Sequence, residues 1–187
     1  MNFQLTEERQ MLQDSLRRYL ADSVSPDALI EATESPSGHV DALWQGLAEM
    51  GVIGALFTEE QGGFGGAGFD LSVVFEEMGR AGAFEPLIEA GVLAGGLLAD
   101  LGGEAQAERV EAIIGGHILA FAHTEPGARY DLERVATTAE KTGDGWRITG
   151  RKSLVGFAGV AEGFVVTART GGDVDATDGI SVFFVKP

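Results

Sequence analysis

The stretch Ala120–Asp131 reads AFAHTEPGARYD and marks the point where the pattern of the chain changes. Apolar residues open it, and a hydroxyl, a carboxylate and a Pro-Gly turn follow directly. A strand that ends at a turn accounts for this order, since Pro and Gly together favour a sharp reversal. A shelf for a cofactor accounts for it too, because the Thr124 hydroxyl can both donate and accept hydrogen bonds at the end of an apolar strand. The residues on either side distinguish the two interpretations.

The part of the chain before residue 117 has the periodicity of helices. Its apolar residues recur three and four positions apart, the spacing of one face of an α-helix. Thr6 is placed to cap a first helix, with Glu7 and Glu8 near the positive end of its dipole. Pro26 should end that helix, and Asp70 should cap a later one. The expected apolar stripes lie at residues 12–20, 40–47, 71–78, 87–97 and 110–114.

After residue 117 the periodicity changes to that of strands. Thr, Val, Phe and Ile become prominent, and Gly143-Asp144-Gly145 has the composition of a hairpin turn. Strands are expected at residues 118–122, 134–140, 146–149, 153–155, 163–168 and 180–185. Helices followed by strands, without βαβ alternation, predict the α+β class. We expect an N-terminal all-α helical domain over residues 1–116 and an antiparallel β-domain over residues 117–187.

Charge is distributed as unevenly as the periodicity. Residues 1–116 carry 20 acidic and 5 basic side chains, a net charge of −15, whereas residues 117–187 carry 9 and 8, a net charge of −1. Nucleic acid is not expected as a partner, because binding phosphate needs a basic surface. An anionic ligand would prefer the second part of the chain. Alternatively, the acidic side chains serve only solubility.

Several kinds of site are disfavoured by the composition. The sequence has no cysteine, so thiolate metal sites, disulfides and thiol nucleophiles are excluded, and its histidines are too scattered to predict a metal site. Residues 63–68 match G-x-G-x-x-G, but no strand directly precedes them, so they are interpreted as a glycine-rich loop between helices. Ala90–Ala99 is too short to span a membrane, and the acidic start is unlike a secretory signal. We therefore expect a cytoplasmic protein.

Five stretches occur in a fixed order along nearly the whole chain. They are Phe3–Glu8 (FQLTEE), Leu47–Gly51 with Thr58–Gly66 (LAEMG and TEEQGGFGG), Phe75–Arg80 (FEEMGR), His123–Ala128 (HTEPGA) and Trp146–Lys152 (WRITGRK). Together they resemble the acyl-CoA dehydrogenase family, the flavin enzymes that desaturate acyl-CoA thioesters. The resemblance implies a helical N-terminal domain, FAD as cofactor, and a middle β-domain that faces the flavin. It also implies that residues 117–187 form only an incomplete antiparallel barrel or sandwich.

The resemblance assigns roles to residues of this sequence. The implied cofactor-binding residues lie on two stretches: Phe121, His123, Thr124, Leu154, Val155 and Gly156. Arg129 and Tyr130 are implied to bind substrate, and they stand where family members often have Gly-Ser. Arg129 either offers charge to an anionic ligand or is only exposed to solvent. No residue is carried over as the catalytic base, which in this family is usually a glutamate of a C-terminal helical domain.

The function implied by the resemblance is the FAD-dependent α,β-desaturation of an acyl-CoA thioester, by proton abstraction and hydride transfer to the flavin. Its implied partners are an acyl-CoA substrate, an electron-transfer flavoprotein as electron acceptor, and further subunits in a homo- or hetero-oligomer. The chain by itself is expected to be inactive without a C-terminal domain or a partner.

Two alternatives remain open. Tyr130 and Gly156 depart from the family pattern, which favours a non-catalytic subunit that pairs with an active chain. The acidic helices would suit a non-enzymatic interaction module, although this leaves the HTEPGA and WRITGRK stretches unexplained.

Overall fold

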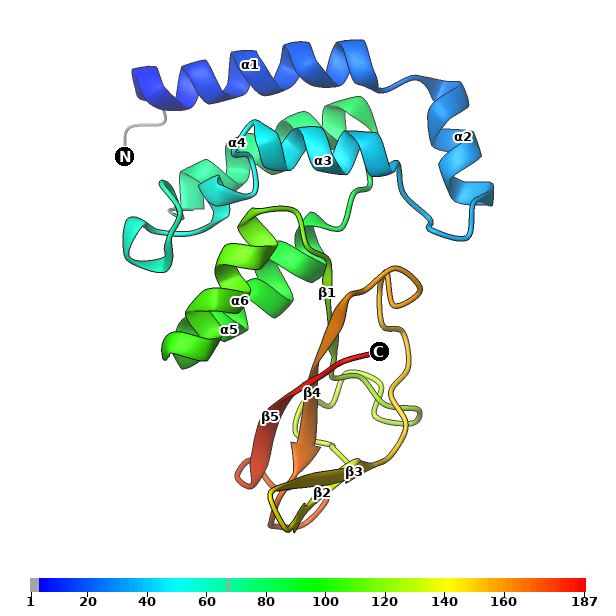
Figure 1. Cartoon of the computed structure of the whole chain (residues 1–187). Helices are drawn as coiled ribbons and strands as arrows, with labels where there is room; N and C mark the ends of the chain where they lie inside the picture. Colours follow the sequence, from blue (N-terminus) through cyan, green and yellow to red (C-terminus); the bar gives the residue numbers. More distant parts are fainter. Residues whose placement is uncertain (1–3, 67) are drawn as a thin grey trace. The chain divides into compact units, whose positions relative to one another are not determined.

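Two compact units divide the chain, one over Met1–His117 and the other over Ile118–Pro187. The computed structural model describes residues 4–66 and 68–187, so Phe3 and Ala67 of the stretches above lie outside the described residues. The first unit is built of helices and the second around a sheet (Figure 1). The α+β class expected from the periodicity is thus confirmed.

The helical unit begins as its sequence predicts. Its elements are α1 (Glu7–Ser23), α2 (Pro26–Glu34), α3 (Asp41–Glu49), η1 (Gly54–Leu56), η2 (Glu59–Gln61), α4 (Gly68–Ala81), η3 (Leu87–Gly95), α5 (Gly96–Leu101) and α6 (Glu104–Ile114). The Thr6 hydroxyl caps α1 by accepting from the backbone N–H of Arg9. Pro26 is the first residue of a further helix, α2, which the sequence analysis missed. Proline is tolerated at that position because the N–H it lacks would have no helical partner.

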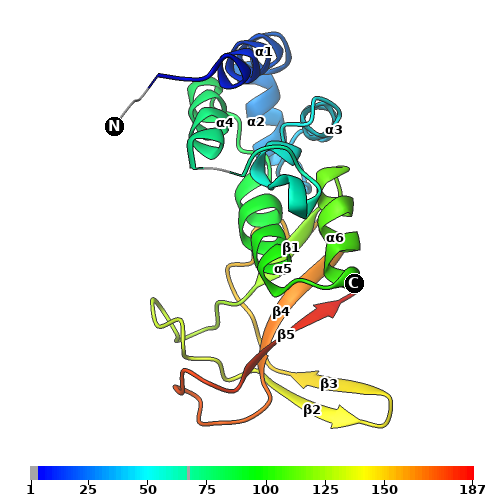
Figure 2. The ribbon, with the colours of Figure 1, turned by 90° about the vertical axis from the view of Figure 1, so that its left-hand side faces the viewer.

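Ion pairs join α1 to α4, and the two helices lie side by side in both ribbon views (Figures 1 and 2). Asp70 was expected to cap α4, but it lies within the first turn of that helix. Its carboxylate accepts two hydrogen bonds from the guanidinium of Arg9. Arg17 likewise donates two hydrogen bonds to Glu77, whose side chain is 1% exposed. Apolar side chains fill the interior of this unit; among them are Leu16, Leu47, Ile53, Phe57, Val74 and Ile113.

One expected helix is divided into two elements. The apolar stripe at residues 87–97 forms the π-helix η3, followed by α5. Two glycines of η3 approach neighbouring side chains closely: a Cβ at Gly91 would lie 2.5 Å from Leu56 Cδ1, and one at Gly95 would lie 2.6 Å from Phe57 Cζ. The wide helix therefore packs at these positions only because no side chain is present there.

Strand β4 is the centre of the sheet in the second unit. The strands are β1 (Leu119–Ala122), β2 (Thr138–Thr142), β3 (Gly145–Thr149), β4 (Gly163–Arg169) and β5 (Ile180–Val185). β5 pairs antiparallel with β4 along its length, and β1 pairs parallel with it from Leu119↔Gly163 to Ala122↔Val166. The β2–β3 hairpin turns at Gly143-Asp144, as expected, and meets β4 only at Thr138↔Arg169 (Figure 2).

The sheet is mixed and open, which corrects the expectation of purely antiparallel strands. Residues 123–162 connect β1 to β4 through a long segment that includes the β2–β3 hairpin, and parallel pairing requires such a crossover. Residues 134–137 and 153–155, expected as strands, are loops. The first segment bonds to the Glu125 carboxylate through the N–H groups of Ala136 and Thr137. The second bonds to the Thr124 carbonyl through the N–H of Ser153. These contacts replace the regular backbone pairing of a strand.

Candidate functional site

Two loops meet at the end of β1, and they carry the two stretches implied to bind the cofactor. The backbone N–H of Ser153 donates to the Thr124 carbonyl at 2.8 Å. Lys152 Nζ donates to the His123 carbonyl at 3.0 Å. Residues 27 or more positions apart in the sequence therefore lie against one another.

Lys152 is the centre of this junction. Its ammonium also donates to Glu125 Oε1 at 2.7 Å and to Thr167 Oγ1 at 3.3 Å. The ammonium thereby uses all of its donors on the protein. Both members of the ion pair are buried, with side chains 11% and 6% exposed. Removing either one would leave a buried charge without a partner, which is costly.

The Glu125 carboxylate also closes the loop that follows it. It accepts from the backbone N–H groups of Ala136 at 2.7 Å and Thr137 at 3.0 Å. Burial alone would raise its pKa, but the hydrogen bonds from Lys152 and from these N–H groups lower the pKa to about 2. Burial lowers the pKa of Lys152, and the contact with Glu125 opposes this shift. Glu125 is therefore ionised at neutral pH, and its carboxylate favours the charged form of Lys152.

Both ring nitrogens of the His123 imidazole form hydrogen bonds within the protein. Nδ1 lies 2.8 Å from Thr167 Oγ1, and Nε2 lies 3.1 Å from the Leu132 carbonyl oxygen. The ring stacks on Phe121, with centroids 5.6 Å apart. The pairing of β1 with β4, continued past the strand, places His123 beside Thr167. The ring nitrogens of this implied cofactor residue thus have partners within the chain.

The other implied cofactor residues are accessible to different degrees. Phe121, Thr124, Val155 and Gly156 are half-buried, and Leu154 is 92% exposed. Among the described residues, the hydroxyl of Thr124 has no hydrogen-bond partner. The two loops therefore offer a polar group, an apolar side chain and a glycine backbone within one junction. Thr124 is not enclosed in a packed interior, and Leu154 is not covered by neighbouring side chains.

Unusual backbone conformation is concentrated on the same two loops. Within residues 4–66 and 68–187, the non-glycine residues with positive φ are Arg129, Leu154 and Phe157, each at 54°. A side chain in this left-handed region costs about 1–2 kcal/mol relative to the usual conformation. Such residues persist where the surrounding structure holds them, and they cluster at functional sites.

Arg129 and Tyr130 lie at the tip of the loop that begins at Glu125. Both are exposed, and Tyr130 is 99% exposed. Backbone turns shape this tip, with Ala128 N–H donating to the Glu125 carbonyl and Asp131 N–H to the Ala128 carbonyl. The structure does not bring these two side chains into a pocket.

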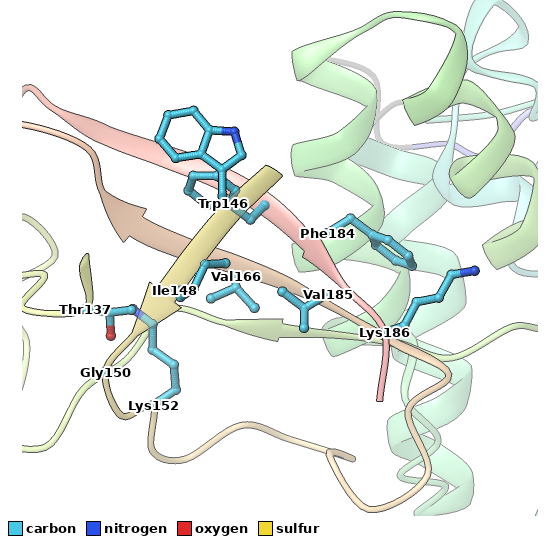
Figure 3. Close-up of a pocket in the computed structure, with 10 residues that line it drawn as sticks. Thr137, Trp146, Ile148, Gly150, Lys152, Val166, Phe184, Val185 and Lys186 are labelled. Carbon is cyan, nitrogen blue, oxygen red and sulfur yellow. The ribbon is translucent and has the colours of Figure 1, made fainter. Parts of the chain in front are cut away.

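A cavity of about 670 Å³ opens on the sheet (Figure 3). Trp146 and Ile148 of β3 face Val166 of β4 and Val185 of β5 across it, and Lys152 lines its border. Phe183 also lines the cavity and meets the Trp146 ring edge to face at 5.4 Å. None of the implied cofactor residues lines this cavity, so the apolar sheet face and the loop junction are distinct features that share Lys152.

The residues that hold the junction together were not predicted from the sequence. Glu125 belongs to the HTEPGA stretch and Lys152 to the WRITGRK stretch, but the sequence alone indicated no role for either side chain. Thr167 was expected only as part of a strand. Arg169 was also missed, although it is a buried cation at the end of an apolar strand, which is a signal in itself.

The described part of the chain has neither a cluster of metal ligands nor a helix suited to span a membrane. No group of three or more His, Asp or Glu side chains there is arranged to hold a metal ion. None of the helices in residues 4–66 and 68–187 has the length and apolar character to cross a membrane.

Comparisons with known proteins agree over the whole chain. Residues 6–114 match the N-terminal domain of acyl-CoA dehydrogenases, and residues 120–187 match the middle domain. The benzylmalonyl-CoA dehydrogenase of Aromatoleum aromaticum is 34% identical over 183 residues, which cover 95% of this chain and 48% of that protein. The chain spans about half the length of the curated relatives it matches first.

Solved structures show the same fold. A chain of the ChsE4-ChsE5 complex from Mycobacterium tuberculosis has a TM-score of 0.79 at 28% identity, covering all of this chain and 49% of that one. A chain of a structure described as the electron transferring flavoprotein of Acidaminococcus fermentans has a TM-score of 0.86 at 28% identity, covering all of this chain and 50% of that one. The protein belongs to the acyl-CoA dehydrogenase family, of which it contains the N-terminal domain and middle-domain sequence.

Proposed function

We propose that the chain contributes the flavin-facing part of an FAD-dependent acyl-CoA dehydrogenase. The observation that carries the proposal is the junction of the two loops, where Ser153 and Lys152 bond to the carbonyls of Thr124 and His123. Family membership favours FAD as the cofactor, and the junction brings together the two stretches that would bind it. The division at residue 116, with a helical domain before and a flavin-facing β-domain after, is part of the same proposal.

The groups at the junction fit a flavin. The Thr124 hydroxyl suits the polar edge of the ring system, since it can donate or accept. Leu154 offers apolar contact, and Gly156 leaves its backbone open to approach. Phe121 and Val155 are apolar neighbours within the same two stretches. His123 contributes its backbone, because its ring nitrogens bond to Thr167 and Leu132.

Thr124 and Leu154 would hold a flavin, which would supply the hydride-accepting chemistry for the β-carbon of an acyl-CoA thioester. The residues of this chain orient and shield that reaction. Thr124 orients the polar edge of the ring system, and Leu154 excludes water from one side. Arg129 offers charge to an anionic group of the coenzyme A part, and Tyr130 lies beside it at the loop tip. An acyl-CoA substrate, an electron-transfer flavoprotein and a cytoplasmic location belong to this proposal.

Titration of the chain with FAD tests the proposal. We expect saturable binding, with a shifted visible spectrum as the ring leaves water. Thr124→Val keeps the shape of the side chain but removes the hydroxyl, and should weaken FAD binding by about tenfold. Thr142→Val, at the end of β2, is the matched control and should leave the affinity unchanged. A wild-type chain that takes up no FAD from excess cofactor would contradict the proposal.

A second candidate is a subunit that pairs with a related active chain. Leu154 is 92% exposed, and Gly156 lacks the side chain that family members often place over the flavin. The ChsE4-ChsE5 complex shows that a chain of this fold occurs in a two-chain assembly. This candidate is tested by co-expressing the chain with a related family member and measuring the molecular mass of the purified assembly. A protein that forms no mixed assembly, and reduces its own flavin with acyl-CoA, would contradict it.

A further inference from the structure

The loop from Glu125 to Thr137 is tied down at its base and at its middle. The Glu125 carboxylate holds its far end through Ala136 and Thr137. Arg169 donates to the carbonyls of residues 133 and 135. The side-chain tie closest to the exposed tip is the contact from His123 Nε2 to the Leu132 carbonyl oxygen, at 3.1 Å.

The hydrogen-bond network determines which nitrogen of His123 carries the proton. A carbonyl oxygen only accepts, so Nε2 must donate to Leu132. Lys152 donates to Thr167 Oγ1, which leaves the hydroxyl hydrogen of Thr167 free to point at Nδ1. The network is therefore satisfied by a neutral imidazole with its proton on Nε2.

The surroundings of the ring keep it neutral. Burial lowers the pKa of His123, and the Lys152 ammonium lowers it further. The charged groups that face it are Lys152, from the loop after β3, and Glu125, from the turn after β1, whereas β4 contributes the uncharged Thr167. A second proton, on Nδ1, would make the ring a cation beside the Lys152 ammonium.

We propose that His123 is a positioning residue whose Nε2–H fixes the Leu132 carbonyl and thereby sets the loop tip that presents Arg129 and Tyr130 to the coenzyme A part of the substrate. The ligand in this inference rests on the proposed function. The tie to Leu132 does not, since it lies within the chain. The role differs from the one that the resemblance implied, because the ring acts on the loop and not on the flavin.

Nitrogen NMR of the imidazole tests the tie in the wild-type chain. At neutral pH we expect a protonated Nε2 and an unprotonated, hydrogen-bonded Nδ1. An Nε2 without a proton would overturn the proposal, because two acceptors cannot share a hydrogen bond. This measurement needs no variant and no ligand.

Two substitutions separate the two nitrogens. In His123→Gln the amide nitrogen lies where Nε2 lies, so it can still donate to Leu132, whereas His123→Asn reaches only as far as Nδ1. Amide exchange at residues 127–132 should rise by about tenfold in His123→Asn and stay within about twofold of wild type in His123→Gln. Wild-type exchange in His123→Asn would overturn the proposal.

Titrations with coenzyme A and with FAD complete the test. His123→Asn should weaken coenzyme A binding by about fivefold, and His123→Gln should restore it. Unchanged coenzyme A affinity in His123→Asn overturns the positioning role. Failure of the wild-type chain to bind FAD contradicts the proposed function instead, and leaves the exchange experiment to decide on the tie.

Discussion

At the scale of single residues, Arg169 ties together loops that lie far apart in the sequence of the second unit. It is 6% exposed, and its guanidinium donates to backbone carbonyls on two loops. These are the carbonyls of Glu133, Val135, Gly171, Val174, Ala176 and Asp178. The negative ends of these carbonyl dipoles therefore surround the buried guanidinium and stabilise its charge.

Arg169→Lys should destabilise the sheet unit, because an ammonium cannot reach the same set of carbonyls. We expect the free energy of unfolding to fall by about 3 kcal/mol, as buried carbonyls lose their donors. Urea unfolding followed by Trp146 fluorescence measures the change. Arg134→Lys is the matched control: Arg134 pairs with Asp175 at the surface and should contribute less than about 1 kcal/mol. Equal effects of the two substitutions would contradict this assignment.

Arg129 is held in a conformation that glycine adopts without cost. Its φ of 54° is strained for any residue with a Cβ. Arg129→Gly should therefore raise the free energy of unfolding by about 1 kcal/mol and, under the proposed function, weaken coenzyme A binding. Gly127→Ala makes the opposite change at a φ of 88° and should lower stability. A destabilised Arg129→Gly would show that the side chain itself supports the loop.

At the scale of elements, the glycine-rich loop before α4 is shaped by close packing. A Cβ at Gly63 would overlap the carbonyl oxygens of Gly54 and Phe57. Gly63→Ala should therefore cost about 2 kcal/mol in denaturant unfolding, since backbone cannot move aside. Gly79→Ala, inside α4, is the matched control: nothing lies within 4 Å of its added Cβ, so it should stabilise by up to about 1 kcal/mol. The same sign for both substitutions would contradict this.

Periodicity predicted most of the elements, because apolar spacing follows the local geometry of helix and strand. It predicted α1, α3 and the β2–β3 hairpin. It missed α2, where a short helix starts at the proline that ends the previous one. It also missed the π-helix η3 and the parallel pairing of β1 with β4, which depend on contacts between distant segments.

The candidate site was predictable in place but not in detail. The motif residues indicated two stretches, and the structure brings these together at the end of β1. The contact of Lys152 with Glu125 and the turn of His123 toward Leu132 join residues 27 and 9 positions apart. No local pattern encodes such pairings, since they arise only once the strands have set the register.

At the scale of the whole molecule, each unit contains a buried carboxylate with a different response to pH. In the sheet unit, hydrogen bonds lower the pKa of Glu125 to about 2. Its stabilising effect is present above the usual value of 4.5 and is lost as the pH falls toward 2. In the helical unit, Glu85 is 6% exposed, and its Oε1 accepts from the Val40 N–H at 3.2 Å. Burial raises its pKa to about 7.

Glu85→Gln should reveal the sign of this second effect. The raised pKa means that the folded state keeps a proton that the unfolded chain releases above 4.5, so the stabilisation is complete below 4.5 and is lost as the pH rises through 7. The glutamine retains the acceptor for Val40 without a charge. The variant should therefore be more stable than wild type by about 3 kcal/mol near pH 8, and the gain should disappear near pH 4.5.

Unfolding followed through Trp44, which is 1% exposed in the helical unit, measures this difference in a Trp146→Phe background. Glu49→Gln at the end of α3 is the matched control, because it makes the same chemical change at an exposed side chain. A Glu85→Gln variant that is less stable than wild type near pH 8 would mean that the ionised carboxylate has a partner in the folded unit. The charged form of Glu85 would then stabilise the fold, and lowering the pH below 7 would no longer increase the stability of the helical unit.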